Sequence, residues 1–138
     1  MKTNKLKGSD LRIGNLVKYC NGVYRIIEVS PIHLLVQNAN DINDIQHRAI
    51  QNAEPIELTE EVLVKIGFEK HDEAMNIYAF ENERAIVVYV PNRKLLKIEG
   101  VENDVLIDRN IRLNNIKYLH QLQNAYYCLT NEELEVEL

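Results

Sequence analysis

Alternating hydrophobic and polar residues mark the first forty positions of the chain as β-structure. Two strand-like runs, residues 16–20 and 23–29, flank the dipeptide Asn21-Gly22. Asn-Gly is a strong hairpin signal because both residues of a tight hairpin turn take positive φ. Pro31 cannot donate a ladder hydrogen bond, so it ends the second run, and residues 32–36 form a third. The pattern predicts an N-terminal β-meander, of the kind that opens SH3-like barrels.

The meander is bordered by less regular sequence. Residues 1–10 are polar, and we expect them to be flexible. Residues 37–44 (QNANDIND) have the composition of a polar loop. Residues 45–53 are ambiguous, because IQHRAI fits a short strand that closes the barrel and IQNAE fits a single helical turn.

A short helix with signals at both ends follows within residues 54–68 (EPIELTEEVLVKIGF). Thr59 is a suitable N-cap, and the two glutamates after it lie where the helix dipole favours anions. Leu58 and Leu63 have the spacing of a hydrophobic staple. Gly67 supplies the left-handed residue at the C-terminal end, so that Phe68 folds back onto the helix. These signals predict a helix of about two turns with a structural role.

The next segment predicts an antiparallel meander. Strand-like runs occupy residues 76–80, 84–90 and 94–99, then a turn region at 100–104, and then 105–108 with 111–113, as one strand or a pair. An antiparallel sheet usually has one face that must be covered. The predicted cover is a helix over residues 114–129.

At 100° per residue that helix has two stripes. The sheet-facing stripe comprises Tyr118, Leu119, Leu122, Ala125, Tyr126 and Leu129. A second, polar ridge comprises His120, Gln123, Asn124 and Tyr127, spaced i, i+3, i+4 and i+7. Asn131 suits the left-handed position after the helix. Residues 132–138 alternate between apolar residues and glutamate, which predicts a final, half-buried edge strand with an acidic outer side.

Together these elements predict an α+β protein, with residues 1–138 forming a single domain. Its two sub-units would be the β-meander of residues 11–53 and the sheet with helices of residues 54–138. A chain of 138 residues, 46% of them hydrophobic and 27% charged, buries a core of its own without disulfides or metals. We expect Cys20 and Cys128 to be free, packed thiols, although their spacing does not exclude a disulfide.

Charge and hydropathy restrict the partners. The net charge is −5, which disfavours broad electrostatic binding of nucleic acid. The first thirty residues are nevertheless basic, through Lys2, Lys5, Lys7, Arg12, Lys18 and Arg25. No apolar run approaches 18 residues, and the N-terminus lacks the apolar segment of a signal peptide. We therefore expect no membrane span and a cytoplasmic location.

Catalytic and metal-binding motifs do not stand out. The four histidines, His33, His47, His71 and His120, form no metal-type pair, and the His71-Asp72-Glu73 run reads as a polar turn. The five glycines are scattered and form no phosphate loop. We expect no cofactor, no metal and no enzymatic activity.

Three segments resemble a known family. EPIELTEEVLVKIGFEK (residues 54–70), IKYLHQLQNAYYCLTNEELEVEL (residues 116–138) and the opening LRIGN (residues 11–15) are similar to small Bacteroidetes proteins encoded near prophages and mobile elements. Asn131 replaces the usual glycine of that family, and Val62 stands where many members have tryptophan. The resemblance implies a phage or mobile-element role and brings no assigned activity.

Three functional hypotheses follow. The first is a small cytosolic binding or adaptor protein that engages a protein partner or forms a homodimer. The second is nucleic-acid or nucleotide binding through Lys5, Lys7, Arg12, Lys18 and Arg25, or through the ridge from His120 to Tyr127. The least favoured is an enzyme with a cleft between the two halves. The ridge itself has two interpretations, a binding surface or polar groups that satisfy neighbouring structure, and the second is favoured.

Overall fold

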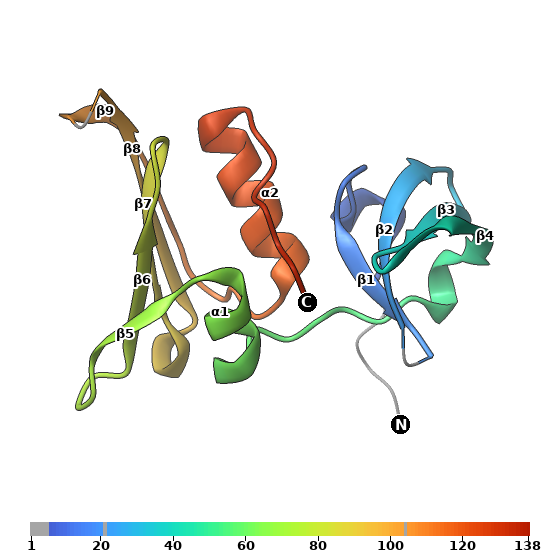
Figure 1. Cartoon of the computed structure of the whole chain (residues 1–138), viewed down its shortest axis with the longest axis horizontal. Helices are drawn as coiled ribbons and strands as arrows, with labels where there is room; N and C mark the ends of the chain where they lie inside the picture. The colour runs from blue at the N-terminus through green and yellow to red at the C-terminus, as the bar shows by residue number, and fades with distance from the viewer. Residues whose placement is uncertain (1–5, 21, 104) are drawn as a thin grey trace. The chain divides into compact units, whose positions relative to one another are not determined.

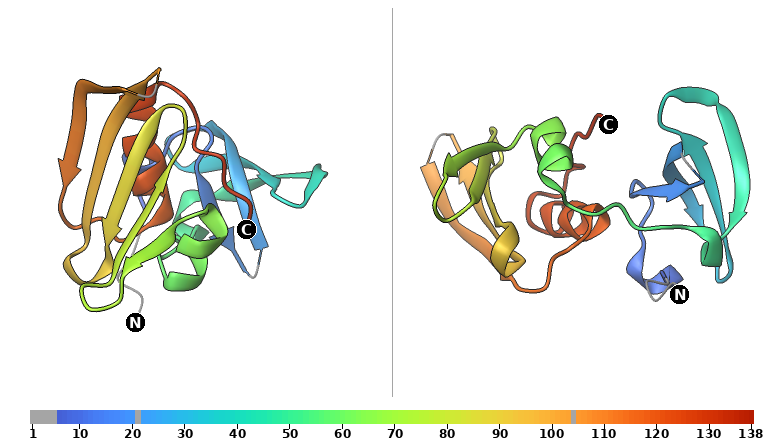
Figure 2. Two further views of the ribbon diagram at one scale, coloured as in Figure 1. Left: turned by 60° about the vertical axis from the view of Figure 1, so that its left-hand side comes forward. Right: turned by 90° about the horizontal axis from the view of Figure 1, so that it is seen from below.

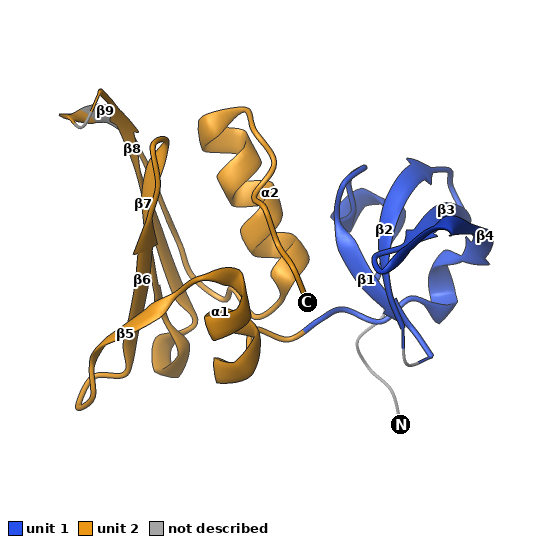
Figure 3. Cartoon of the chain, in the orientation of Figure 1, with its two compact units in different colours: residues 1–56 blue, residues 57–138 orange. Residues whose placement is uncertain are grey.

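The computed structural model describes residues 6–20, 22–103 and 105–138 and confirms the α+β class. The chain divides into two compact units, residues 1–56 and residues 57–138 (Figures 1 and 3). The division falls three residues beyond the end of the predicted β-meander.

The first unit is a four-stranded antiparallel meander in the order β1-β2-β3-β4. Its strands are β1 (Leu16–Tyr19), β2 (Gly22–Val29), β3 (His33–Asn38) and β4 (Asp41–Ala49), and two 3-10 turns accompany them, η1 (Gly8–Asp10) and η2 (Ile50–Asn52). After η2 the chain returns to β1, where the backbones of Lys18 and Glu54 exchange two hydrogen bonds of 2.9 Å. The segment after β4 therefore flanks the first strand.

Alternate residues of β1, β2 and β3, together with residues before β1 and after β4, build the core of this unit. The buried residues are Leu11, Val17, Tyr19, Tyr24, Ile26, Leu34, Val36, Ile50 and Ala53, with Leu6 packed against them. Leu6 and η1 therefore belong to the folded part of the chain, whereas we expected residues 1–10 to be flexible. Residues 1–5 lie outside the described residues.

The structure corrects two turns of the predicted meander. The β1–β2 hairpin exists, but Gly22 pairs with Tyr19 and so belongs to β2 and not to an Asn21-Gly22 turn. Cys20 takes the left-handed φ of 54°, and Asn21 lies outside the described residues. The expected loop over residues 37–44 is mostly strand, because β3 and β4 leave only residues 39–40 between them. The ambiguous residues 45–53 supply both the end of β4 and η2.

The second unit is a five-stranded antiparallel sheet in the order β5-β6-β7-β8-β9. Its elements are α1 (Glu60–Ile66), β5 (Glu69–Asp72), β6 (Ile77–Glu81), β7 (Ala85–Val90), η3 (Pro91–Arg93), β8 (Leu95–Glu102), β9 (Val105–Leu113) and α2 (Leu119–Thr130). Both helices lie on the same side of the sheet, as two views show (Figures 1 and 2). The predicted cover of the sheet by the C-terminal helix is confirmed.

The ends of α1 are built as predicted. The Thr59 hydroxyl accepts a hydrogen bond of 3.2 Å from the Val62 amide. Gly67 has a φ of 121°, and the Phe68 amide donates to the Leu63 carbonyl at 2.9 Å. Leu58 and Leu63 are both buried, so the two ends of the helix are anchored to the core.

Several predicted strand boundaries are wrong. The His71-Asp72-Glu73 run was expected to be a turn, but His71 and Asp72 belong to β5, which pairs with β6. The expected turn at residues 100–104 is wrong at its start, because β8 continues to Glu102 and pairs with a single long β9 that begins at Val105. These segments contain polar residues or glycine, yet pairing with a neighbouring strand holds them in the sheet.

The C-terminal helix begins at Leu119, five residues after the predicted start. Residues 114–118 instead turn back, with Asn115 at a φ of 61°, and the Lys117 carbonyl accepts from the Leu58 amide at 3.0 Å. The Gln121 side chain then accepts from the amides of Lys117 (2.7 Å) and Tyr118 (3.0 Å) and so caps α2. Five residues of the predicted packing stripe lie in the helix and are buried, namely Leu119, Leu122, Ala125, Tyr126 and Leu129. The sixth, Tyr118, precedes the helix and is half-buried.

The last seven residues form no strand. Asn131 has the predicted left-handed conformation, with a φ of 61°, and turns the chain out of α2. The predicted alternation is present, because Leu134 and Val136 are buried while the glutamates of residues 132–138 are exposed. The segment nevertheless joins no sheet, so the predicted edge strand is wrong in its pairing.

Candidate functional site

The polar ridge of α2 lies on one helix face, as its spacing predicted. His120 and Gln123 are buried, Asn124 is half-buried, and Tyr127 exposes 36% of its surface. The His120 ring stacks on the Tyr118 ring, with centroids 5.8 Å apart and planes 10° apart. A ligand therefore reaches chiefly Tyr127, which leaves the ridge with less binding surface than its sequence suggests.

The basic residues of the N-terminal unit lie on several elements. Lys7 and Lys18 are exposed, before η1 and on β1, whereas Lys5 lies outside the described residues. Arg12 donates to the Ile13 carbonyl at 2.8 Å, and Arg25 donates to the Gly14 carbonyl at 3.2 Å. Both guanidinium groups thus spend part of their donor capacity on backbone, which lowers their value as phosphate ligands.

Metal and thiol chemistry find little support in the described part of the chain. No group of three or more His, Cys, Asp or Glu residues there is arranged to hold a metal ion. Cys20 and Cys128 are free, as expected, but both are exposed and not packed in the core. Neither described helix has the length and apolar character needed to cross a membrane.

The second unit has a pocket of about 750 Å³. We call it the acidic groove. Four segments line it, namely the end of α1, the β6–β7 hairpin, one tyrosine of α2 and the C-terminal segment. The lining residues are Lys65, Ile66, Phe80, Asn82, Glu83, Arg84, Tyr126, Glu132, Glu133, Leu134, Glu135 and Glu137. Its volume is within the range typical of ligand and peptide sites.

Specific contacts hold the walls of the acidic groove in place. Asn82 donates from its side-chain amide to the Tyr126 hydroxyl at 2.9 Å, which joins the β6–β7 hairpin to α2. The same Asn82 accepts from the amides of Arg84 and Ala85 and so shapes the hairpin turn. Arg84 forms an ion pair of 2.6 Å with Glu132, which joins the hairpin to the start of the C-terminal segment.

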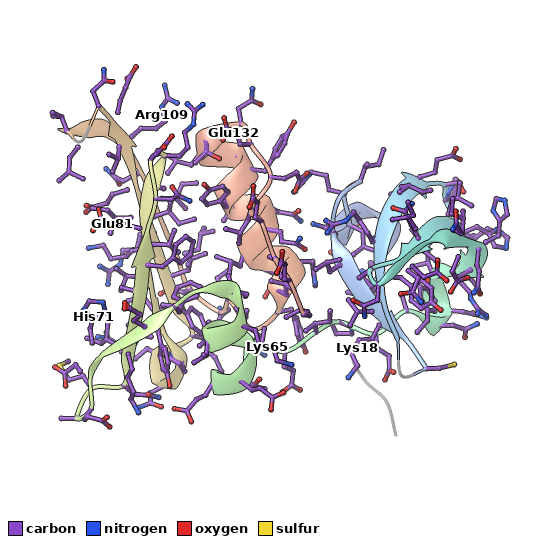
Figure 4. All side chains as sticks on the ribbon, in the orientation of Figure 1. Lys18, Lys65, His71, Glu81, Arg109 and Glu132 are labelled. Atoms are coloured by element: carbon purple, nitrogen blue, oxygen red, sulfur yellow. The ribbon has the colours of Figure 1, made fainter. Side chains whose placement is uncertain are left out.

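Negative charge dominates this lining. Five carboxylates and two cations leave a formal charge of −3. Arg84 is paired with Glu132, and Lys65 lies 3.8 Å from Glu61 of the preceding helical turn. Lys65 belongs to α1 and Glu132 follows α2, and both side chains are labelled in Figure 4. The groove therefore presents acceptor-rich, anionic walls to solvent.

The floor of the acidic groove is apolar in part. Ile66 and Phe80 are half-buried, and Leu134 is buried. Phe80 packs edge to face against Phe68, with ring centroids 4.7 Å apart, so its position is set by the core. A bound segment with one cationic side and one apolar side would therefore be complementary to the anionic walls and to the apolar floor.

A smaller pocket of about 140 Å³ adjoins this region and shares Arg84. Arg109 donates to the Leu129 carbonyl at 3.4 Å at the end of α2. Arg109 and Glu132 are seen near the same end of that helix (Figure 4). Cations at a helix C-terminus interact favourably with its dipole, so we assign Arg109 a structural role.

Sequence reasoning missed the groove. The glutamates of residues 132–137 predict the acidic outer side of an edge strand and give no indication of a groove. Nothing in the sequence indicates that Asn82 and Arg84, some fifty residues earlier, meet the C-terminal segment. The one available signal was the density of carboxylates after α2 with no basic residue among them.

Comparison with protein-family models, curated proteins and solved structures finds no match to this chain. The resemblance to the Bacteroidetes mobile-element family therefore stays a prediction.

Proposed function

We propose that the protein is a non-enzymatic binding module whose acidic groove accepts a cationic segment of another protein. The observation that carries the proposal is the groove itself, a pocket of about 750 Å³ with five glutamates and two cations. Opposite charges steer an encounter and suppress wrong partners, so such a lining selects basic segments over acidic ones.

The composition of the lining supports binding over catalysis. It contains carboxylates, one amide, one phenol and apolar side chains, and within the described residues it has no histidine, cysteine or serine. The nucleophile–base pairs of covalent catalysis need such residues in hydrogen-bond reach. The same lining also disfavours nucleic acid as its occupant, because phosphates and carboxylates repel each other.

The sequence resemblance supports the wider setting of the proposal. A binding or adaptor protein of a prophage or mobile element, acting in the cytoplasm on a host or phage protein, fits a groove whose lining has no histidine, cysteine or serine among the described residues. The binding activity does not depend on that setting and is tested on its own.

The test is a titration with defined peptides. A fluorescently labelled eight-residue peptide of alternating lysine and threonine is compared with its glutamate–threonine counterpart by fluorescence anisotropy. We expect saturable binding of the lysine peptide only, weakening by about tenfold between low and physiological salt because the contacts are exposed and screened.

Charge reversal locates the binding. The double variant Glu135→Lys/Glu137→Lys should lower the affinity for the lysine peptide by about tenfold or more, because two attractive charge interactions become repulsive. The matched control Glu28→Lys/Glu69→Lys changes the net charge equally at exposed positions away from the groove lining. Equal loss in both variants, or no binding by the natural chain, would refute the proposal.

A further inference from the structure

The C-terminal segment that borders the acidic groove pairs with no strand of the described residues. Residues 134–138 make no backbone hydrogen bond to any described residue and are assigned to no strand. Their side chains alternate as in a strand, with Leu134 and Val136 buried and Glu135 and Glu137 exposed. An extended backbone with one buried side and open amide and carbonyl groups is a template for strand addition.

We infer that residues 134–138 bind the partner by β-strand addition, and that the partner is an extended segment with basic and apolar residues in alternation. This inference rests on the proposed function and adds the mode of recognition. Five residues of strand span roughly 16 Å, enough for a ladder with a short peptide. Main-chain hydrogen bonds supply affinity in this mode, and side chains at alternate positions supply specificity.

The surroundings of the segment define the partner's two sides. An added strand places every second side chain beside Glu133, Glu135 and Glu137, because directly opposed residues have Cβ atoms about 4.5–5.5 Å apart. Lysine or arginine at these positions pairs with the glutamates. The intervening side chains face the interior, where Ile66 and Phe80 line the groove and offer apolar surface. The favoured sequence is therefore basic–apolar–basic–apolar–basic.

Charge also argues against a second copy of this chain as the occupant. Two C-terminal segments paired with each other would bring their glutamates together, and like charges directly opposed destabilise a strand pair. An acidic edge thus disfavours self-pairing while it remains open to a basic strand. Glu135 and Glu137 therefore favour a basic partner strand and disfavour pairing with a second copy of the chain.

The test modifies the peptide and leaves the protein unchanged. A seven-residue peptide of alternating lysine and valine is compared with two relatives, a block peptide with the same composition and a set with N-methyl groups at alternate backbone amides. N-methylation removes a ladder donor and keeps every charge. Strand addition predicts that two peptides bind at least about fivefold more weakly than the alternating peptide, because ladder hydrogen bonds are lost. These are the block peptide and the peptide whose N-methylated amides are the ones that face residues 134–138.

The outcomes separate the two proposals. If all lysine peptides bind within about twofold of each other while Glu135→Lys/Glu137→Lys still abolishes binding, strand addition is wrong and the acidic groove stands as the binding site for a cationic segment. If no lysine peptide binds, both fail. If sedimentation shows that the peptide-free protein dimerises and truncation after Glu133 makes it monomeric, the edge is occupied by a second copy and the basic strand is the wrong partner.

Discussion

Replacing Tyr89 by phenylalanine tests how the second unit holds the start of α2 in place. Tyr89 exposes 1% of its surface, and its hydroxyl donates a 2.5 Å hydrogen bond to the Ile116 carbonyl in the loop before α2. Burial raises the pKa of this phenol to about 12, so the hydroxyl is a neutral donor at any ordinary pH. The substitution keeps the ring and deletes only the donor.

The expected cost follows from the acceptor that is left behind. Ile116 exposes 6% of its surface, so water does not readily replace the lost donor. Losing the bond and leaving a buried carbonyl unpaired costs about 2 kcal/mol, or about a 30-fold increase in the unfolded-to-folded ratio. The second unit, residues 57–138, falls in the size range of 60–100 residues, for which a loss of about 2 kcal/mol lowers the melting temperature by roughly 8–16 °C.

The assay is urea unfolding followed by NMR at the amides of Ile98 and Leu122, which report on the sheet and on α2 of the second unit. Tyr118→Phe is the matched control, because the Tyr118 hydroxyl makes no hydrogen bond to a described residue and should leave stability within about 0.5 kcal/mol. If Tyr89→Phe is as stable as the control, the hydrogen bond does not anchor the loop and the reasoning is refuted.

Three further changes have expected outcomes. The Tyr78 hydroxyl, and then the Lys70 ammonium, hold the pKa of Glu60 below its usual value of 4.5, so this carboxylate stabilises the fold above that pH and the effect is lost on acidification. An acid titration of stability should therefore be flatter in Glu60→Gln than in the natural chain, and identical acid limbs would contradict this. Gly67→Ala forces a side chain into a φ of 121° and should cost about 1–2 kcal/mol by urea unfolding, whereas Gly67→Asn should cost less; equal costs would mean that φ is not the cause. Arg84→Gln releases Glu132 from its exposed ion pair, so it should tighten lysine-peptide binding a few-fold while stability changes by less than about 1 kcal/mol; weaker binding would contradict the electrostatic account.

Local signals predicted much of the fold. Thr59 and Gly67 set the two ends of α1, and the alternation of β6, β7 and β8 placed those strands, because caps and periodicity depend on neighbours in sequence. Boundaries failed where a distant segment supplied the hydrogen bonds. The 114–118 segment has a helical pattern, yet pairing of Lys117 with Leu58 keeps it out of α2. Tertiary contacts of this kind override intrinsic propensity.

The candidate site was harder to predict than the fold. Helical spacing correctly aligned the ridge from His120 to Tyr127, but spacing does not show which face of a helix stays accessible. The acidic groove depends on Asn82 and Arg84 meeting Tyr126 and Glu132, a set of contacts between segments more than forty residues apart. The sequence shows that glutamate and apolar residues alternate in the C-terminal segment. It does not show that this segment pairs with no strand of the described residues.

The most direct test of the central claim is an amide NMR titration of the full chain with the alternating lysine–valine peptide. We predict shift changes confined to residues 65–66, 80–84 and 132–138, together with slower hydrogen exchange at alternate amides of residues 134–138 on binding. Shift changes centred on the basic N-terminal unit or on the His120–Tyr127 ridge, or none at saturating peptide, would contradict the account.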